Sequence, residues 1–215
     1  MDSKFGTGSW HKRDGYKNQF ERTYRWLVRL QDLESGQFVQ VRTDHSLQRD
    51  YLLAFFNACF SIRDWVKGEA GWNKIAARVD SDVQLLLCRD IANGSKHMTL
   101  THPSVDADFG FATRVGPEGH KIAFAVSSEK LVKAMEVAYE KIANTYGGSI
   151  DVASLHAELK SNGIHNVPGL PIFMDAMKLA ADCLAAWELY LEKADLLTKE
   201  EIAKLKENAF NHKGF

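Results

Sequence analysis

Arg89 and His97 are the two residues whose types and spacing best suit chemistry at a site. They lie in the segment CRDIANGSKH, which spans residues 88–97. A histidine titrates near neutral pH and can give or take a proton, and the planar guanidinium of an arginine can hold a phosphate or a developing negative charge. Together these groups suit proton transfer and charge stabilisation at a phosphate ester.

Helical periodicity places two further polar side chains beside this pair. At 100° per residue, one arc of about 100° holds four polar residues: Arg89, Asn93, Lys96 and His97. The opposite side of the same helix is apolar. Because Arg89 and His97 are eight positions apart, their Cα atoms lie about 12 Å apart along a straight helix. We interpret this face as the candidate site, where Asn93 and Lys96 could hold a phosphate or a base.

A second polar stripe occurs on a helix that is otherwise apolar nearly all round, which predicts the central helix of a bundle over about 47–67. Its three polar residues recur at positions i, i+4 and i+7: Asn57, Ser61 and Asp64. Buried polar groups need partners. The structural alternative to a site is therefore an ion pair between Arg89 and Asp64, with Asn57 and Asn93 as neighbours.

The elements that must position these residues follow from apolar spacing. Ser81 with Gln84, and Thr198 with Glu201, have the spacing of capping boxes at helix starts. Tryptophans are expected mainly in the core: Trp65, Trp72 and Trp187. Apolar residues that recur every three or four positions predict helices over about 18–33, 72–79, 128–146, 151–162 and 172–193. A helix is also predicted after each capping box.

Alternating apolar residues on both sides of the turn sequence GPEG indicate a β-hairpin. The predicted fold is therefore mainly all-α, a helical bundle with a β-hairpin inserted at about 105–126. A loop and short helix form an excursion at 147–171. Residues 1–17 are basic and rich in glycine, which predicts a flexible arm before a single domain of residues 18–215.

Composition narrows the classes of function. The formal net charge of −1 gives no global attraction to nucleic acid, so any contact with RNA has to be local. The three cysteines lack paired spacing and are interpreted as core residues in a reducing compartment, not as a disulfide frame or zinc site. No apolar run is long enough to span a bilayer. We expect a cytoplasmic protein with no metal site and no cofactor.

The segment CRDIANGSKH, together with the segments FNAC and RDW of the preceding predicted helix, resembles the HEPN superfamily of small helical bundles. Arg89 takes the arginine place of the family motif, Asp90 the polar place, and His97 the histidine place, at a spacing wider than the family's usual one. The resemblance covers about residues 20–98 and 172–195.

This resemblance implies metal-independent cleavage of RNA, in which the substrate's own 2′-hydroxyl attacks the adjacent phosphate. It assigns Arg89 and His97 as catalytic residues. Supporting or RNA-binding roles fall to Asp90, Asn93, Lys96, Asp64 and Asn57. It also implies a homodimer of the toxin or defence type, with a protein partner or antitoxin. The second expectation is a non-catalytic dimerisation or docking module that uses the hairpin or the excursion as its contact.

Overall fold

The described part of the chain is mainly helical, which confirms the predicted fold class at that level. A computed structural model describes residues 15–34, 45–94, 110–116, 119–127 and 171–211, with a few positions between 133 and 140. The predicted arm up to residue 14 lies outside the described residues, as do Lys96, His97 and the predicted excursion at 147–171 apart from its last residue.

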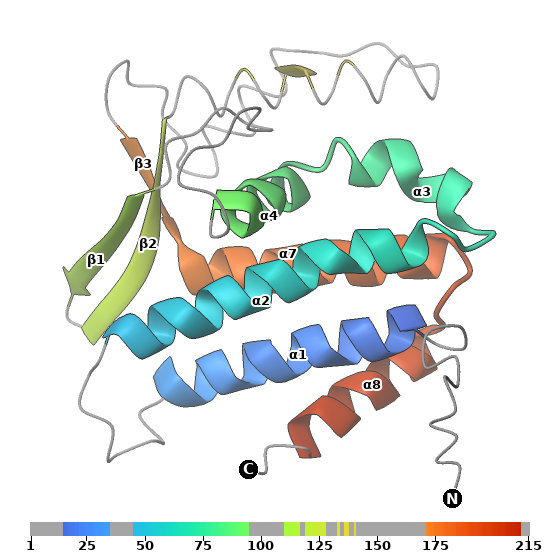
Figure 1. Cartoon of the computed structure of the whole chain (residues 1–215), viewed down its shortest axis with the longest axis horizontal. Coiled ribbons are helices and arrows are strands. Elements are labelled where there is room, and N and C mark those ends of the chain that lie inside the picture. Colours follow the sequence, from blue (N-terminus) through green and yellow to red (C-terminus); the bar gives the residue numbers. More distant parts are fainter. Residues whose placement is uncertain are drawn as a thin grey trace, which may run out of the picture.

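A central helix organises the bundle, as the apolar sequence around residue 55 predicts. It contacts several other helices, and the last described helix packs against the first helix of the chain (Figure 1). The helices are α1 (Gly15–Glu34), the central α2 (His45–Val66), α3 (Trp72–Val79), α4 (Val83–Gly94), α7 (Ala176–Lys193) and α8 (Lys199–Asn211). Among the described residues, no helix is long and apolar enough to cross a membrane.

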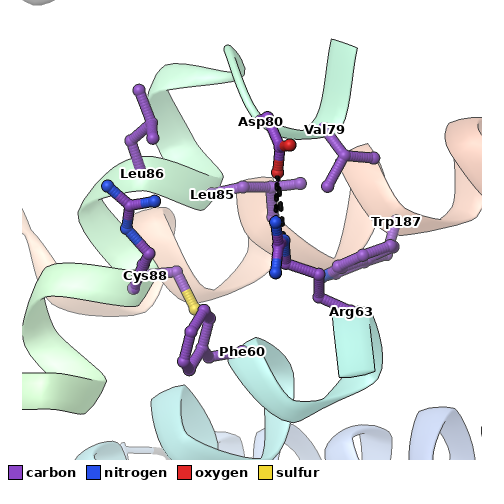
Figure 2. Close-up of a pocket in the computed structure, with 9 residues that line it drawn as sticks. Phe60, Arg63, Val79, Asp80, Leu85, Leu86, Cys88 and Trp187 are labelled. Atoms are coloured by element: carbon purple, nitrogen blue, oxygen red, sulfur yellow. Dashed lines mark hydrogen bonds and ion pairs between the residues drawn. The ribbon is translucent and has the colours of Figure 1, made fainter. Parts of the chain in front are cut away.

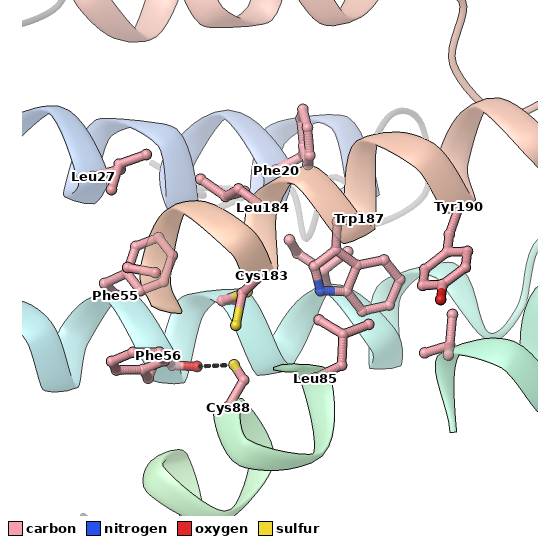
Figure 3. Packing of buried hydrophobic residues seen from close by; sticks show 14 of the residues in the cluster. Phe20, Leu27, Phe55, Phe56, Leu85, Cys88, Cys183, Leu184, Trp187 and Tyr190 are labelled. Carbon is pink, nitrogen blue, oxygen red and sulfur yellow. Dashed lines mark hydrogen bonds between the residues drawn. The ribbon is translucent and has the colours of Figure 1, made fainter. Parts of the chain in front are cut away.

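The core lies where α2 meets α1, α4 and α7. Phe55, Phe56 and Ile62 of α2 are fully buried, and Trp187 of α7 belongs to the same core cluster with 2% of its surface exposed. Figure 3 shows Phe55, Phe56 and Trp187 in this core. Trp72 is also buried, as predicted. The expectation for Trp65 is wrong, because this side chain is 36% exposed at the end of α2. Its ring covers Gly15 at the start of α1 and does not enter the core.

Three strands form a small antiparallel sheet in the order β1-β2-β3. β1 (Gly110–Gly116) pairs with β2 (Gly119–Ser127), with Gly116 opposite Gly119 at the turn. β2 then pairs with β3 (Pro171–Asp175), so that Ser127 faces Pro171. The long helix predicted from residue 172 therefore begins later, at Ala176.

Asp175 explains why the chain changes from strand to helix at this point. Its backbone is extended, and its carboxylate accepts hydrogen bonds from the backbone N–H groups of Met177 and Lys178 at 2.9 Å each. An aspartate in this position satisfies donors that the first helical turn leaves unpaired. The apolar residues of β3 continue the helical spacing of α7 by coincidence, which is why periodicity alone misplaced the boundary.

The capping box predicted at the start of α8 is confirmed. The Thr198 N–H donates to Glu201 at 2.9 Å, and the Glu201 N–H donates to the Thr198 hydroxyl at 3.2 Å. We expect Thr198→Ala to lower the free energy of unfolding by about 1 kcal/mol, because the hydroxyl acceptor is lost. Thr198→Ser keeps that acceptor and should change the free energy of unfolding by only a few tenths of a kcal/mol. Urea unfolding of both variants checks the prediction, and equal losses would contradict it.

The capping box predicted at Ser81 and Gln84 is wrong by one residue. Asp82 takes the capping place of α4, because its Oδ1 accepts a hydrogen bond from the Leu85 N–H at 3.1 Å. Ser81 is buried immediately before it. Asp82 was the better cap in chemical terms, since a carboxylate is a strong acceptor and favours the positive end of the helix dipole.

Candidate functional site

A pocket lies where α2, α4 and α7 meet the turn that joins α3 to α4 (Figure 2). It is a small hollow with a cavity volume of about 20 Å³, room for about one water molecule. Three charged side chains interrupt an otherwise apolar or weakly polar lining. The residues around it are Phe60, Arg63, Val79, Asp80, Leu85, Leu86, Cys88, Arg89 and Trp187. This volume is far below that of a small-molecule site, so the polar groups of the lining, and not an enclosed cavity, are the candidate contacts for a ligand.

Arg89 lies at the pocket because the residues next to it on α4 point into the core and leave its own side chain facing outward. Leu87, Cys88 and Asp90 are each no more than 1% exposed, whereas the Arg89 side chain keeps 36% of its surface in solvent. Its Nε lies 3.9 Å from Oδ1 of Asp90. The arrangement presents a guanidinium at the pocket with a carboxylate behind it.

Arg63 brings a second guanidinium to the same pocket. Its Nε and Nη2 each lie 3.0 Å from Oδ1 of Asp80, and its guanidinium carbon lies 5.8 Å from the centre of the Trp72 ring. These contacts fix the arginine of α2 against the end of α3. The sequence offered one signal for Arg63, its place in the segment RDW, but the polar stripe on α2 pointed to the adjacent Asp64.

The ion pair expected between Arg89 and Asp64 is not formed. Asp64 is exposed to solvent at the end of α2. The Asn57 amide donates to the Leu53 carbonyl, and the Ser61 hydroxyl donates to the Asn57 carbonyl, both at 2.8 Å. Asparagine and serine can thus bond to the carbonyl one turn earlier in their own helix. For this reason a polar stripe on α2 does not require a polar partner on α4.

The other predicted site residues fall into three groups. Asp90 is 1% exposed, so its carboxylate does not face solvent where an RNA would approach. Asn93 is partly buried, one turn beyond Arg89 on α4. Lys96 and His97 lie outside the described residues. The structure therefore brings Arg89 together with Arg63 and Asp80, and it leaves the Arg89–His97 pairing untested.

A partly buried carboxylate at the start of α4, that of Asp82, was not foreseen from the sequence. Asp82 Oδ2 accepts a hydrogen bond from the Tyr190 hydroxyl at 2.7 Å, while Oδ1 caps α4. Burial raises the pKa of Asp82 above its usual value, although the hydrogen bonds from Tyr190 and from the α4 backbone act in the opposite direction. The carboxylate thus links α4 to α7 and titrates at a higher pH in the folded than in the unfolded chain.

This shift in the pKa of Asp82 predicts a pH dependence of stability. Because the folded state binds the proton more tightly, the contribution of Asp82 is present in full below its unfolded pKa and is lost as pH rises through its folded pKa. We therefore expect Asp82→Asn to flatten the fall in the free energy of unfolding over that interval. Tyr190→Phe removes a bond that lowers the pKa, so it should extend the fall to higher pH. Urea unfolding across pH measures both, and an unchanged slope in Asp82→Asn would contradict the assignment.

Within the described ranges, no group of three or more histidine, cysteine, aspartate or glutamate side chains is placed to hold a metal ion. In comparisons with known proteins, no family model, no curated protein and no solved structure matches this chain. The resemblance to HEPN proteins therefore depends on the sequence motif alone.

Proposed function

We propose that the chain is a metal-independent endoribonuclease of the HEPN type, with its site at the pocket and the end of α4. The observation that carries the proposal is the position of Arg89, whose half-exposed guanidinium lines the pocket. The structural alternative required an enclosed Arg89 paired with Asp64, and Asp64 is instead exposed.

The charges around the pocket suit a phosphate. Arg89 is the cation that could bind it at the pocket, because Arg63 is already paired with the Asp80 carboxylate at 3.0 Å. A guanidinium can donate two parallel hydrogen bonds to the oxygens of a phosphate, and Arg89 retains the solvent exposure that such a contact requires. Phe60 supplies an aromatic surface in the same lining, and bases stack on aromatic side chains in single-stranded RNA recognition.

The proposed reaction uses the substrate's own nucleophile. The 2′-hydroxyl attacks the adjacent phosphorus, the bond to the 5′-oxygen of the next nucleotide breaks, and a 2′,3′-cyclic phosphate remains. His97 transfers a proton in this step, and Arg89 stabilises the negative charge that grows on the phosphorane oxygens. In a homodimer, residues of the second copy could complete the site across the wide Arg89–His97 spacing.

Incubation of purified protein with single-stranded RNA in a chelator tests the proposal. We expect the wild type to cleave, and His97→Ala to lose about 10²–10⁴-fold in rate, because general acid–base catalysis supplies about that much. Arg22→Ala is the matched control, since Arg22 is an exposed residue of α1 and does not line the pocket. Prepared in the same way, it should keep full activity, so that a loss confined to His97→Ala excludes both a contaminating nuclease and an effect of the preparation.

The second function, a non-catalytic dimerisation or docking module, makes the opposite prediction. If wild type and His97→Ala show the same rate in the chelator, His97 is not catalytic. If neither preparation cleaves any of a panel of structured and unstructured RNAs, the ribonuclease proposal fails and the docking module is favoured.

A further inference from the structure

A carboxylate occupies the hydrogen-bonding edge of the second arginine at the pocket. Nε and Nη2 of Arg63 both lie 3.0 Å from a single oxygen, Oδ1 of Asp80. Figure 2 shows the guanidinium directed from α2 toward this carboxylate, which belongs to the turn after α3. An arginine binds carboxylates and phosphates alike, through parallel hydrogen bonds from one edge of the guanidinium. Asp80 therefore takes the place that a phosphate oxygen would take on Arg63.

The ion pair is exposed enough for its anion to be exchanged. The side chains of Arg63 and Asp80 keep 27% and 28% of their surface in solvent. Ion pairs with exposed partners contribute little to stability, because water solvates both charges when they separate. Separation of a fully buried pair would instead leave uncompensated charges in the core. A phosphate that approaches from solvent can thus replace the Asp80 carboxylate without disturbing the core.

Arg63 has a further contact that does not depend on Asp80. Its guanidinium carbon lies 5.8 Å from the centre of the Trp72 ring, and Trp72 is itself buried in the core. A cation over an aromatic face is held by the charge distribution of the ring. The guanidinium therefore keeps a fixed neighbour when its carboxylate partner is replaced.

Arg63 and Arg89 reach the same small pocket from different helices, the first from α2 and the second from α4. The cavity has room for about one water molecule, so a phosphate would meet these side chains at the surface and not inside it. Proteins that bind single-stranded nucleic acid follow its backbone with positive charge. Two guanidiniums at one pocket suit two phosphates of the same strand.

We propose that Arg63 is a second phosphate-binding residue of the site, and that Asp80 occupies its donor edge until a phosphate of single-stranded RNA replaces the carboxylate. This role rests on the proposed function, in which Arg89 binds the phosphate that is cut. While the carboxylate is in place, it cancels the charge of Arg63 and competes with RNA. Removing the charge of Asp80 should therefore strengthen RNA binding.

Fluorescence anisotropy with a labelled single-stranded 2′-O-methyl RNA tests this proposal on the full-length protein. The probe carries the phosphates of RNA but lacks the 2′-hydroxyl nucleophile, so binding is measured without cleavage. Asp80→Asn keeps the size of the side chain and removes the competing charge. We expect it to tighten binding about two- to fivefold, which is the range that an exposed ion pair supplies.

Asp195→Asn is the matched control, because it removes the same charge from an exposed ion pair with Lys74, and neither residue lines the pocket. Asparagine tolerates the positive φ of 57° at this position. Its affinity should equal that of the wild type. Arg63→Gln should lower the salt dependence of binding by one phosphate contact, a slope of about 0.7 for a single strand. It should also abolish the gain when combined with Asp80→Asn.

Equal affinities of Asp80→Asn and the wild type, an equal gain in Asp195→Asn, a gain that persists in the double variant, or a probe that does not bind would each overturn the proposal. Far-UV circular dichroism establishes which variants fold, and the two aspartate variants decide the question where Arg63→Gln does not. Cleavage of an all-ribose RNA by the same preparations keeps the two proposals apart. A gain in affinity without cleavage supports the role of Arg63 and contradicts the ribonuclease, and cleavage without a gain does the reverse.

Discussion

Arg89→Ala is expected to reduce the rate of RNA cleavage by about 10²–10³-fold, because the variant lacks the donor fork that faces the growing phosphorane charge. The fold should tolerate the change. Arg89 is 36% exposed, and its contact with Asp90 is 3.9 Å long, so we expect the free energy of unfolding to change by less than about 1 kcal/mol. Single-turnover cleavage and urea unfolding, measured on the same preparations, separate the two effects.

Arg89→Lys refines this test because it keeps the positive charge and removes the planar fork. We expect a rate between those of the wild type and Arg89→Ala, since a lysine binds phosphate as a point charge and not through two parallel bonds. If Arg89→Ala unfolds the protein while Arg89→Lys retains both fold and full activity, Arg89 is structural and the site assignment is wrong.

Trp187→Ala is expected to lower the free energy of unfolding by about 3–5 kcal/mol, the largest effect on stability that we predict. Trp187 is 2% exposed and packs in the core cluster where α7 meets α2 and α4. Removing a fully buried aromatic side chain loses its transfer free energy and leaves a cavity that neighbouring residues fill only in part. Urea unfolding followed by circular dichroism measures the loss without relying on tryptophan fluorescence.

Trp187→Phe is the matched variant, because it keeps an aromatic ring in the same place and leaves a smaller cavity. We expect less than half the loss of Trp187→Ala. A different comparison comes from Trp65→Ala, which should cost much less than Trp187→Ala because Trp65 is 36% exposed. Similar losses for Trp65→Ala and Trp187→Ala would mean that the core is not where the structure places it.

Helical periodicity predicted the bundle well because most of its helices bury a clear apolar face. The bounds predicted for α3 match the structure, and the apolar circumference of α2 identified the central helix. The errors have local causes. β3 was included in α7 because its apolar residues continue a helical spacing, and the cap of α4 was assigned to Ser81 although the adjacent Asp82 binds the backbone.

The sequence predicted the candidate site less well, because it depends on contacts between distant segments. The Arg63–Asp80 pair joins α2 to the turn after α3, and which of two adjacent residues, Arg63 or Asp64, turns inward is decided by packing. The three buried cysteines, Cys59, Cys88 and Cys183, come near one another in the core for the same reason. The sequence predicted that the three cysteines lie in a core, but whether they lie near one another depends on how the three helices cross.

The most direct test of the ribonuclease proposal compares an RNA with a matched oligonucleotide that carries one 2′-deoxy sugar at the mapped cleavage position. Both are incubated with the wild-type protein in a chelator, and the products are resolved by mass. We predict that the all-ribose strand is cut to give a 2′,3′-cyclic phosphate and that the substituted strand stays intact at that position. Cleavage of the substituted strand there, or an all-ribose strand that remains whole, would contradict the account.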